Sequence, residues 1–416
     1  MIDITFLRDH PKTLQTVCDN RNIERDVSAG LALDTKWRET TDAVQKLQQQ
    51  RNEAAKAKDI ETGKKISAEL KIAEQKLQEL ATQRTDFLYS LPNIPADDAP
   101  IGKDEDENVE TERVGTPRVF DFPVRDHVEI GEMTSTIDIK TARVTSGARF
   151  AFLRGAGALL EDALKNYMRD KLIAEGFEYI IPPSLLRAEC LSNAGGGAGT
   201  TTDKMDAQEM YTLPEDGLGL IGTSEHALAN MHIKETIKNL DTPIRYVGWS
   251  SCFRREAGSA GKDTRGIIRV HEFQKLEMFV YCKPEDSVAE HENLLRLARS
   301  IWDDLEIPYR ILNLCTGDMS WQSAKTYDIE TWMPSQETYR EVCSASNCTD
   351  FQARRTKTKY ITEEGKKEYV HTLNSTAVAI QRAIVAIYEN YQNADGSVTV
   401  PEVLQPYMGM DVISVR

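Results

Sequence analysis

The clearest hydrophobic pattern in this sequence lies near its start, where two stretches repeat apolar residues at helical spacing. The second stretch alternates steps of four and three residues, which is the spacing of a heptad seam: Ile66, Leu70, Ala73, Leu77, Leu80, Arg84 and Phe87. The first stretch carries a poorer stripe of the same kind: Trp37, Val44, Leu47, Ala54 and Ala55. Residues 59–63 interrupt both stripes, and we expect Gly63 to supply a turn there. This pattern predicts an antiparallel helical hairpin, a coiled-coil arm over about residues 35–88 that projects because it has no other core.

Prolines and an acidic run mark the end of this helical part. Residues 91–95 contain two prolines and Pro100 follows, which ends the second helix because proline lacks an N–H donor and clashes with the preceding turn. Four consecutive acids at 104–107 come directly afterwards. We therefore expect two domains, a helical N-terminal domain at 1–100 and a larger domain at 101–416.

The larger domain mixes helical and strand patterns. An amphipathic helix is predicted from Leu159 to Leu172, and a last helix follows the strand at 368–373, with residues 374–376 as its N-cap. The other predicted strands cover 177–181, 245–253 and 268–281, the last two joined by a polar, glycine-bearing loop. Strand pairs with short loops and flanking helices predict an α+β fold, an antiparallel β-sheet with helices packed on it.

Charge is distributed unevenly between the two parts. The whole chain has a formal net charge of −15, yet residues 36–84 contain eleven Lys or Arg against eight acids, so the remainder carries −18. The basic excess has two interpretations that the sequence leaves open: a solvated helix surface, or a prong that binds the backbone of a polyanion. Between Trp37 and Phe87 there are no aromatic residues, so a nucleic-acid partner would be recognised by shape and phosphate contacts.

Composition excludes several classes of protein. With 40% hydrophobic residues the chain can build a sizeable core, and no stretch approaches the ~18 apolar residues of a membrane span. Seven scattered cysteines without a C-x-x-C pair argue against a disulfide framework and against a zinc site. The N-terminus is too polar for a signal peptide, so we expect a cytoplasmic protein.

The residues with the richest chemistry follow the strand at 245–253. The loop at 254–266 holds four basic side chains and three glycines, which suits close approach to a carboxylate or phosphate. On the next predicted strand, side-chain alternation places one set of residues on a single face: Arg269, His271, Phe273, Lys275 and Glu277. Such a face suits a triphosphate, a purine ring and an amine.

Three further groups complete the candidate site. Glu225 could add a carboxylate if its strand lies alongside, Glu341 and Ser344 could hold Mg²⁺ through oxygen ligands, and Arg382 near a helix N-terminus could attract phosphate. Each of these groups, taken alone, more often has a structural role, such as a core acid, a surface salt bridge or a helix cap. Their occurrence together favours a binding site. No P-loop, Rossmann turn, H-E-x-x-H pair or acyl-enzyme triad is present.

At these residues the sequence resembles the bacterial-type seryl-tRNA synthetases, which are class II aminoacyl-tRNA synthetases, over nearly the whole chain. The helix and strand that end at Pro182 and Pro183 resemble the first class II motif, and 253–277 resembles the second with high specificity. Residues 371–374 with Arg382 resemble the third motif. The resemblance implies ATP-dependent activation of L-serine to seryl-adenylate and its transfer to tRNA(Ser), extending to tRNA(Sec), by a homodimer that uses Mg²⁺.

The resemblance also implies residue roles. The catalytic residues would be Arg254 and Arg382. ATP would be bound by Arg254, Arg255, Glu256, Phe273, Glu341, Val342, Cys343, Ser344 and Arg382, with Mg²⁺ on Glu341 and Ser344. Serine would be bound by Thr223, Ser224, Glu225, Glu277 and Thr376. The tRNA would be bound by Lys46, Arg51, Lys56, Lys58, Lys64 and Lys65.

The chain departs from the family pattern at 195–202, a Gly- and Thr-rich stretch, and at 375–377 in the third motif. Two alternatives stay open. One is a paralogue that transfers an activated amino acid to a carrier protein, which the full helical arm disfavours. The other is a non-catalytic coiled-coil module, which the retained charged residues of the site disfavour.

Overall fold

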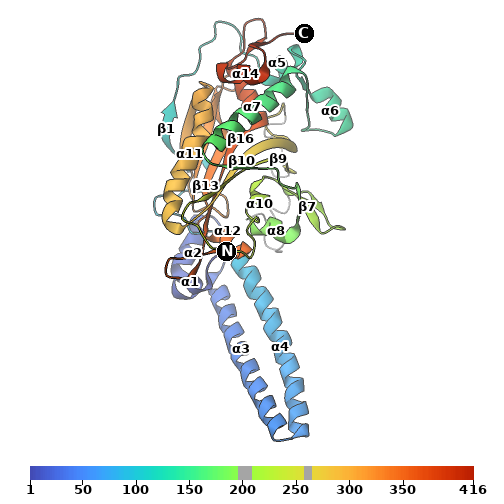
Figure 1. Cartoon of the computed structure of the whole chain (residues 1–416), viewed down its shortest axis with the longest axis vertical. Coiled ribbons are helices and arrows are strands. Elements are labelled where there is room, and N and C mark those ends of the chain that lie inside the picture. Colours follow the sequence, from blue (N-terminus) through green and yellow to red (C-terminus); the bar gives the residue numbers. More distant parts are fainter. Residues whose placement is uncertain (195–208, 257–264) are drawn as a thin grey trace. The chain divides into compact units, whose positions relative to one another are not determined.

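The computed structural model describes residues 1–194, 209–256 and 265–416, which form two compact units, Met1–Ile94 and Pro95–Arg416 (Figure 1). The departure at 195–202 and most of the loop at 254–266 lie outside the described residues. Among the described residues, none of the helices is both long enough and apolar enough to span a membrane.

The first unit is helical. Two short helices, α1 (Ile4–Asp9) and α2 (Pro11–Asn20), precede two helices of thirty residues each, α3 (Val27–Lys56) and α4 (Ile60–Tyr89). The long pair lies side by side as a hairpin (Figure 1), with Val44 and Ala54 buried from α3 and Ile66, Leu70 and Leu80 buried from α4. The predicted helical arm and its seam are confirmed.

The predicted turn residue in this hairpin was wrong. Gly63 lies in the first turn of α4, and the chain reverses at residues 57–59, where Lys58 takes a left-handed φ of 57°. Asp59 caps α4, because its side chain accepts a hydrogen bond of 3.1 Å from the Thr62 amide. The capping aspartate, rather than the glycine, was the signal for the helix start.

A buried carboxylate joins the start of α3 to the end of α4. Asp34 is 1% exposed and accepts hydrogen bonds of 2.7 Å from the Nε atoms of both Arg8 and Arg84. Burial alone would raise the pKa of Asp34, but these two arginines lower it below its ordinary value. Arg84 therefore occupies its seam position as an ion-pair partner and stacks on Trp37 at 4.6 Å.

The second unit is built on an eight-stranded sheet in the order β1-β11-β12-β13-β16-β10-β9-β4. All neighbours in it are antiparallel except β4 and β9, which confirms the predicted antiparallel sheet. Its strands are β1 (Val109–Val114), β4 (Glu178–Ile180), β9 (Ile244–Phe253), β10 (Glu272–Cys282), β11 (Tyr309–Asn313), β12 (Lys325–Met333), β13 (Thr338–Asn347) and β16 (His371–Ala379).

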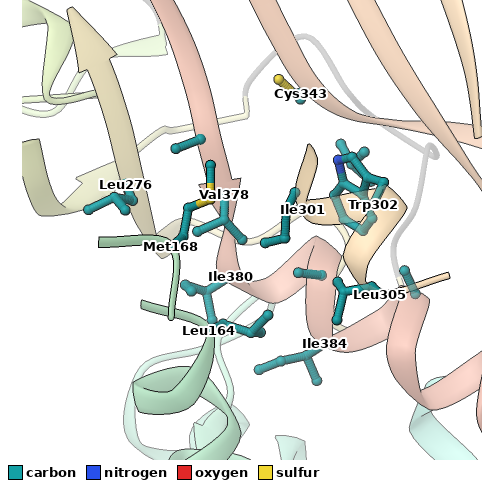
Figure 2. Packing of buried hydrophobic residues seen from close by; sticks show 14 of the residues in the cluster. Leu164, Met168, Leu276, Ile301, Trp302, Leu305, Cys343, Val378, Ile380 and Ile384 are labelled. Carbon is teal, nitrogen blue, oxygen red and sulfur yellow. The ribbon is translucent and has the colours of Figure 1, made fainter. Parts of the chain in front are cut away.

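Three helices pack their apolar sides on this sheet. They are α7 (Ala156–Ala174), α11 (Ser287–Asp304) and α13 (Ile380–Asn390). Figure 2 shows Met168 of α7, Ile301 of α11 and Ile384 of α13 together with Leu276 and Val378 from the central strands. This core fixes β10 and β16, which carry Phe273, Lys275, Glu277 and Thr376 of the candidate site.

Smaller elements surround the sheet. The helical ones are α5 (His127–Met133), α6 (Ile139–Thr145), α8 (Ala188–Asn193), α10 (Glu225–Leu228), α12 (Phe351–Thr356), α14 (Gln405–Met408) and the short 3-10 turns Glu105–Glu107, Pro284–Asp286 and Glu402–Leu404. The strands are β2 (Ile137–Asp138), β3 (Phe152–Leu153), β5 (Leu185–Arg187), β6 (Thr212–Leu213), β7 (Leu218–Leu220), β8 (Thr236–Ile237), β14 (Lys359–Ile361), β15 (Lys367–Tyr369), β17 (Val398–Thr399) and β18 (Val412–Ile413).

Two predicted boundaries near the site are corrected. The second long strand begins at Glu272 and not at Ile268, because the backbone of the preceding segment bonds elsewhere: the His271 amide donates to the Arg149 carbonyl at 3.0 Å and the Ile267 amide to His127 at 3.2 Å. Residues 374–376 are part of β16 and are not an N-cap, since β16 continues to Ala379 and α13 begins at Ile380.

Candidate active site

Two cavities open between the sheet and its connections, and they share Arg254, Lys275, Glu341 and Thr376 in their linings. The smaller cavity, of about 70 Å³, is lined by the end of β9, the start of β10 and the start of α13. The larger cavity, of about 600 Å³, extends over β12, β13 and β16 and includes Glu225 from α10. Three separated stretches of sequence thus converge on one region.

The smaller cavity combines cations with an aromatic ring. The Arg254 guanidinium lies over Phe273 at 5.3 Å from the ring centroid, and its Nε donates to the Gly222 carbonyl at 3.3 Å. Glu256 pairs with Arg269 at 3.0 Å and has a left-handed φ of 51°, a conformation that costs energy in a residue other than glycine. Arg269 also lines this cavity, although it precedes β10 in the sequence.

Arg382 and Glu341 form the charged junction between the two cavities. Arg382 donates to the Glu341 carbonyl at 2.8 Å and lies 3.2 Å from its carboxylate. Glu341 has 46% of its side-chain surface exposed, and it lines both cavities. Burial raises its pKa, but Arg382 and then Arg254 outweigh this, so the pKa of Glu341 is lowered.

Asp328 of β12 is a site residue that the sequence interpretation missed. It lies opposite Ser344 in the strand register, and its buried Oδ1 has no hydrogen-bond partner among the described residues. Burial, followed by the nearby charge of Glu341, raises the pKa of Asp328 well above its ordinary value. Charged residues alternating with Ile329 along β12 were the available signal, because such alternation predicts a polar face on a strand.

Glu277 and Glu225 form the acidic end of the larger cavity. Glu277 is 2% exposed and pairs with Lys275 at 2.6 Å, and the Thr376 hydroxyl donates to it at 3.4 Å. Glu225 is also buried, but it lies in the short helix α10 and not in a strand as expected. Burial and then the charge of Glu277 raise the pKa of Glu225 to about 7.

The other predicted residues divide into three groups. Thr223 and Ser344 line the larger cavity, and Val342 lines the smaller one. The side chains of two further residues face the interior: Ser224 Oγ lies 2.7 Å from Ser250 Oγ, and the Cys343 thiol donates to the Thr376 carbonyl at 2.8 Å. Burial raises the pKa of Cys343, so it stays a thiol. Arg255 is exposed, and its amide donates to the Glu209 carbonyl at 2.8 Å.

The predicted tRNA-binding residues all lie on the hairpin of the first unit. We call this set the arm cations, and all are exposed: Lys46, Arg51, Lys56, Lys58, Lys64 and Lys65. At the hairpin end, Arg51, Lys58 and Lys64 surround a groove of about 430 Å³ that also contains Ile60, which is 72% exposed. The arm cations are therefore not buried in the seam between the two helices, and their charged groups are accessible to solvent.

Comparisons with known proteins agree with this arrangement. The protein-family model "tRNA synthetase class II core domain (G, H, P, S and T)" matches residues 211–391. The family model "Seryl-tRNA synthetase N-terminal domain" matches residues 1–95. The chain is 45% identical to a serine–tRNA ligase of Thermobifida fusca, over 99% of each chain, and 43% identical to that of Corynebacterium diphtheriae, over 100% of each.

Solved structures show the same fold over the full chain. Seryl-tRNA synthetase from Pyrococcus horikoshii complexed with ATP superposes with a TM-score of 0.92, at 38% identity and full coverage of both chains. Cytoplasmic serine–tRNA ligase from Naegleria fowleri in complex with AMP gives 0.88 at 31% identity, covering 100% of this chain and 99% of that one.

The sheet, the convergent cations and the core-domain match define a class II aminoacyl-tRNA synthetase. Within that class, the chain belongs to the seryl-tRNA synthetase family. It is a ligase that activates serine with ATP and charges tRNA with it.

Proposed function

We propose that the smaller cavity binds the adenine end of ATP, that the phosphates extend past Arg382 and Glu341 toward the larger cavity, and that the acidic end of the larger cavity binds serine. The observation that supports this assignment is the position of Arg254, which lines both cavities, together with Phe273 in the smaller one and Glu277 in the larger one. In this arrangement Phe273 stacks on the adenine, Glu256 accepts from its amino group, and Arg382 binds the terminal phosphate. Arg254 bridges the serine carboxylate and the α-phosphate.

The proposed chemistry needs no protein nucleophile. A carboxylate oxygen of serine attacks the α-phosphorus, the bond from phosphorus to the bridging oxygen breaks, and pyrophosphate leaves. The terminal ribose hydroxyl of tRNA then attacks the carbonyl carbon of the adenylate, and AMP leaves. The residues contribute by holding the reactants in line and by stabilising the negative charge that develops at the phosphate.

A divalent cation fits beside Glu341. Mg²⁺ prefers oxygen ligands, and Glu341, Ser344 and Asp328 present carboxylate and hydroxyl oxygens to the larger cavity. The Oδ1 of Asp328 has no hydrogen-bond partner within the described ranges, which supports it as a third ligand. When bound there, Mg²⁺ would neutralise phosphate charge. In this proposal Glu341 and Ser344 are ligands of Mg²⁺, and Asp328 is the third ligand.

The N-terminal unit is the proposed tRNA-binding domain, with tRNA(Ser) and also tRNA(Sec) as partners. The arm cations supply phosphate contacts along an exposed hairpin, which suits a long double-helical element of RNA.

A homodimer is proposed as well. Leu159, Ile173 and Ile181, in and after the first-motif helix, are 44%, 48% and 72% exposed, and a second copy of the chain would cover them. Light scattering at micromolar concentration measures that state.

The central experiment is amino-acid-dependent exchange of labelled pyrophosphate into ATP, run with serine and a panel that includes alanine, threonine and glycine. Serine alone should support rapid exchange. A carrier-protein ligase would show the same exchange, but it would not acylate tRNA. Exchange with another amino acid and not with serine would contradict the proposed pocket assignment.

Replacing all six arm cations with glutamine should raise the KM for tRNA at least tenfold near 100 mM salt. Each lost phosphate contact should also make the salt dependence of tRNA affinity shallower by about 0.7–0.9 in log–log slope. Exchange of pyrophosphate without tRNA should stay at the parent rate, because the arm cations lie in the other unit from both cavities. Aminoacylation kinetics over a salt series measure these effects.

A matched control neutralises six exposed lysines of the second unit: Lys140, Lys234, Lys238, Lys357, Lys366 and Lys367. It should change the KM for tRNA less than twofold. An equal loss in the control and in the arm variant would indicate a general charge effect and would refute the arm as the tRNA-binding element.

Serine binding near pH 7 should release a proton from Glu225. The pKa of this residue is about 7 before binding, so about half of its carboxyls are protonated at that pH. The ammonium group of serine favours the charged carboxylate, which lowers the pKa and expels the proton. Glu277 and Lys275 also face Glu225, and Lys275 already opposes the upward shift.

Calorimetry in buffers of different ionisation enthalpy measures this release. We expect about 0.5 proton at pH 7, more at pH 6, and little at pH 8, where Glu225 is already charged. A Glu225→Gln variant should bind serine more weakly and release no proton. Heats that are independent of the buffer at pH 6.5 would contradict the role of Glu225.

A further inference from the structure

The carboxylate of Glu225 is held on one side only. Its Oε1 accepts hydrogen bonds from three side-chain amides, Gln352 at 2.7 Å, Asn374 at 3.2 Å and Gln322 at 3.4 Å. Its Oε2 accepts none of the hydrogen bonds found among the described residues. One oxygen of this buried carboxylate is therefore saturated, while the other remains available on the cavity side.

Gln352, the second residue of α12, is the shortest and most constrained of these donors. It is 0% exposed, and its Nε2 donates both to Glu225 and to the Ala194 carbonyl at 2.8 Å. Its Oε1 accepts from the Thr372 hydroxyl at 2.7 Å. Because the carbonyl oxygen of the amide is committed to Thr372, its NH₂ group must face Glu225. No rotation of the amide is possible without losing buried hydrogen bonds.

The donors around Glu225 are neutral, which distinguishes it from the neighbouring acid. Glu277 is paired with the Lys275 ammonium at 2.6 Å, whereas no ion pair within the described part of the chain includes Glu225. An amide orients a carboxylate without cancelling its charge. The two acids thus differ: Glu277 is charge-compensated by Lys275 and suits a neutral hydroxyl, while the charged form of Glu225 has no cation paired with it among the described residues and suits an ammonium group.

We propose that Gln352 is a positioning residue for serine binding: by occupying Oε1 of Glu225, it aims Oε2 at the ammonium group of the substrate. This inference rests on the proposed role of Glu225. It assigns to α12, an element outside the three motifs, the task of orienting the substrate amine. Gln352 does not line either cavity, so it acts through Glu225 and not on serine itself.

The first test is Gln352→Met, which keeps the volume and removes both donors. We expect the KM for serine in pyrophosphate exchange to rise about 10- to 100-fold, while the KM for ATP changes less than twofold. Gln352→Glu keeps the acceptor for Thr372 but sets a second acid against Glu225. It should raise the KM for serine at least as much, so the proposal stays testable if the methionine variant folds poorly.

A matched control is Gln392→Met. Gln392 is likewise 0% exposed and fully bonded, since it donates to the carbonyls of Arg125 and Glu389 and accepts from the Arg125 amide, but it lines neither cavity. The Gln392→Met variant should lower the melting temperature about as much as Gln352→Met does, but it should leave the KM for serine unchanged. A similar rise of the KM for serine in both variants would show that Gln352 only stabilises the fold, and it would overturn the inference.

The double variant Glu225→Gln with Gln352→Met separates the inference from the proposed function. If Gln352 acts through Glu225, adding its loss to Glu225→Gln should raise the KM for serine less than twofold further. Full additivity, or an unchanged KM in Gln352→Met beside a raised KM in Glu225→Gln, would overturn the inference alone. An unchanged KM in Glu225→Gln would instead refute the proposed role of Glu225.

Discussion

Replacing Arg254 with alanine should lower the rate of serine-dependent pyrophosphate exchange by about 10²–10³-fold, or roughly 3–4 kcal/mol of transition-state stabilisation. Arg254 lines both cavities and lies over Phe273, so it is placed to contact the serine carboxylate and the α-phosphate together. Its guanidinium would oppose negative charge that develops only as the new bond to phosphorus forms. Steady-state exchange kinetics with saturating serine and ATP measure the loss as a fall in kcat.

The stability of this variant should change little. Arg254 is exposed, and within the described ranges its side chain makes one hydrogen bond, of 3.3 Å to the Gly222 carbonyl. Its removal should therefore leave no buried charge without a partner there. Arg254→Lys should recover only part of the activity, because lysine cannot bridge two acceptors with a planar fork. Arg296→Ala, at an exposed ion pair on α11, is a suitable control for charge loss. Exchange at the parent rate in Arg254→Ala would remove the basis for the proposed site.

The fold was predictable where local pattern and tertiary environment agree. The heptad seam through Ile66, Leu70 and Leu80 predicted the arm, because two helices of that length can bury their stripes only against each other. Likewise, strand pairs with short loops and flanking helices predicted an antiparallel sheet. The Gly63 turn and the 374–376 cap were wrong for a shared reason: glycine and small polar residues favour turns and caps, but a packed strand or helix overrides that preference.

The site was predictable where the chemistry is concentrated in sequence, as it is around Arg254. Asp328 and Gln352 were missed because their partners are set by register and packing. Asp328 meets Ser344 only through the pairing of β12 with β13, and Gln352 meets Glu225 across 127 positions of sequence. An isolated buried glutamine has no signature in a single sequence, since its function depends on which acceptor faces it.

Glu277→Ala should nearly abolish serine activation while ATP still binds. The buried carboxylate is the proposed acceptor for the serine hydroxyl, and losing a charged acceptor in a closed site should raise the KM for serine about 100-fold or more. Discrimination against alanine should fall with it, because a site that no longer needs a hydroxyl donor does not penalise its absence. Exchange kinetics with serine and with alanine, beside direct measurement of ATP affinity, test both effects.

The alanine variant carries a second cost that must be separated from the first. Lys275 is 9% exposed and pairs with Glu277 at 2.6 Å, so Glu277→Ala leaves a buried ammonium without its partner and should destabilise the protein by about 3–5 kcal/mol. Lys275 also lines both cavities, and its stranded charge would attract phosphate. The double variant Lys275→Met with Glu277→Gln removes the charges together and should regain stability without regaining serine activation. If ATP affinity falls as far as serine affinity in Glu277→Ala, where Lys275 is retained, Glu277 acts on the whole pocket and is not the residue that recognises the serine hydroxyl.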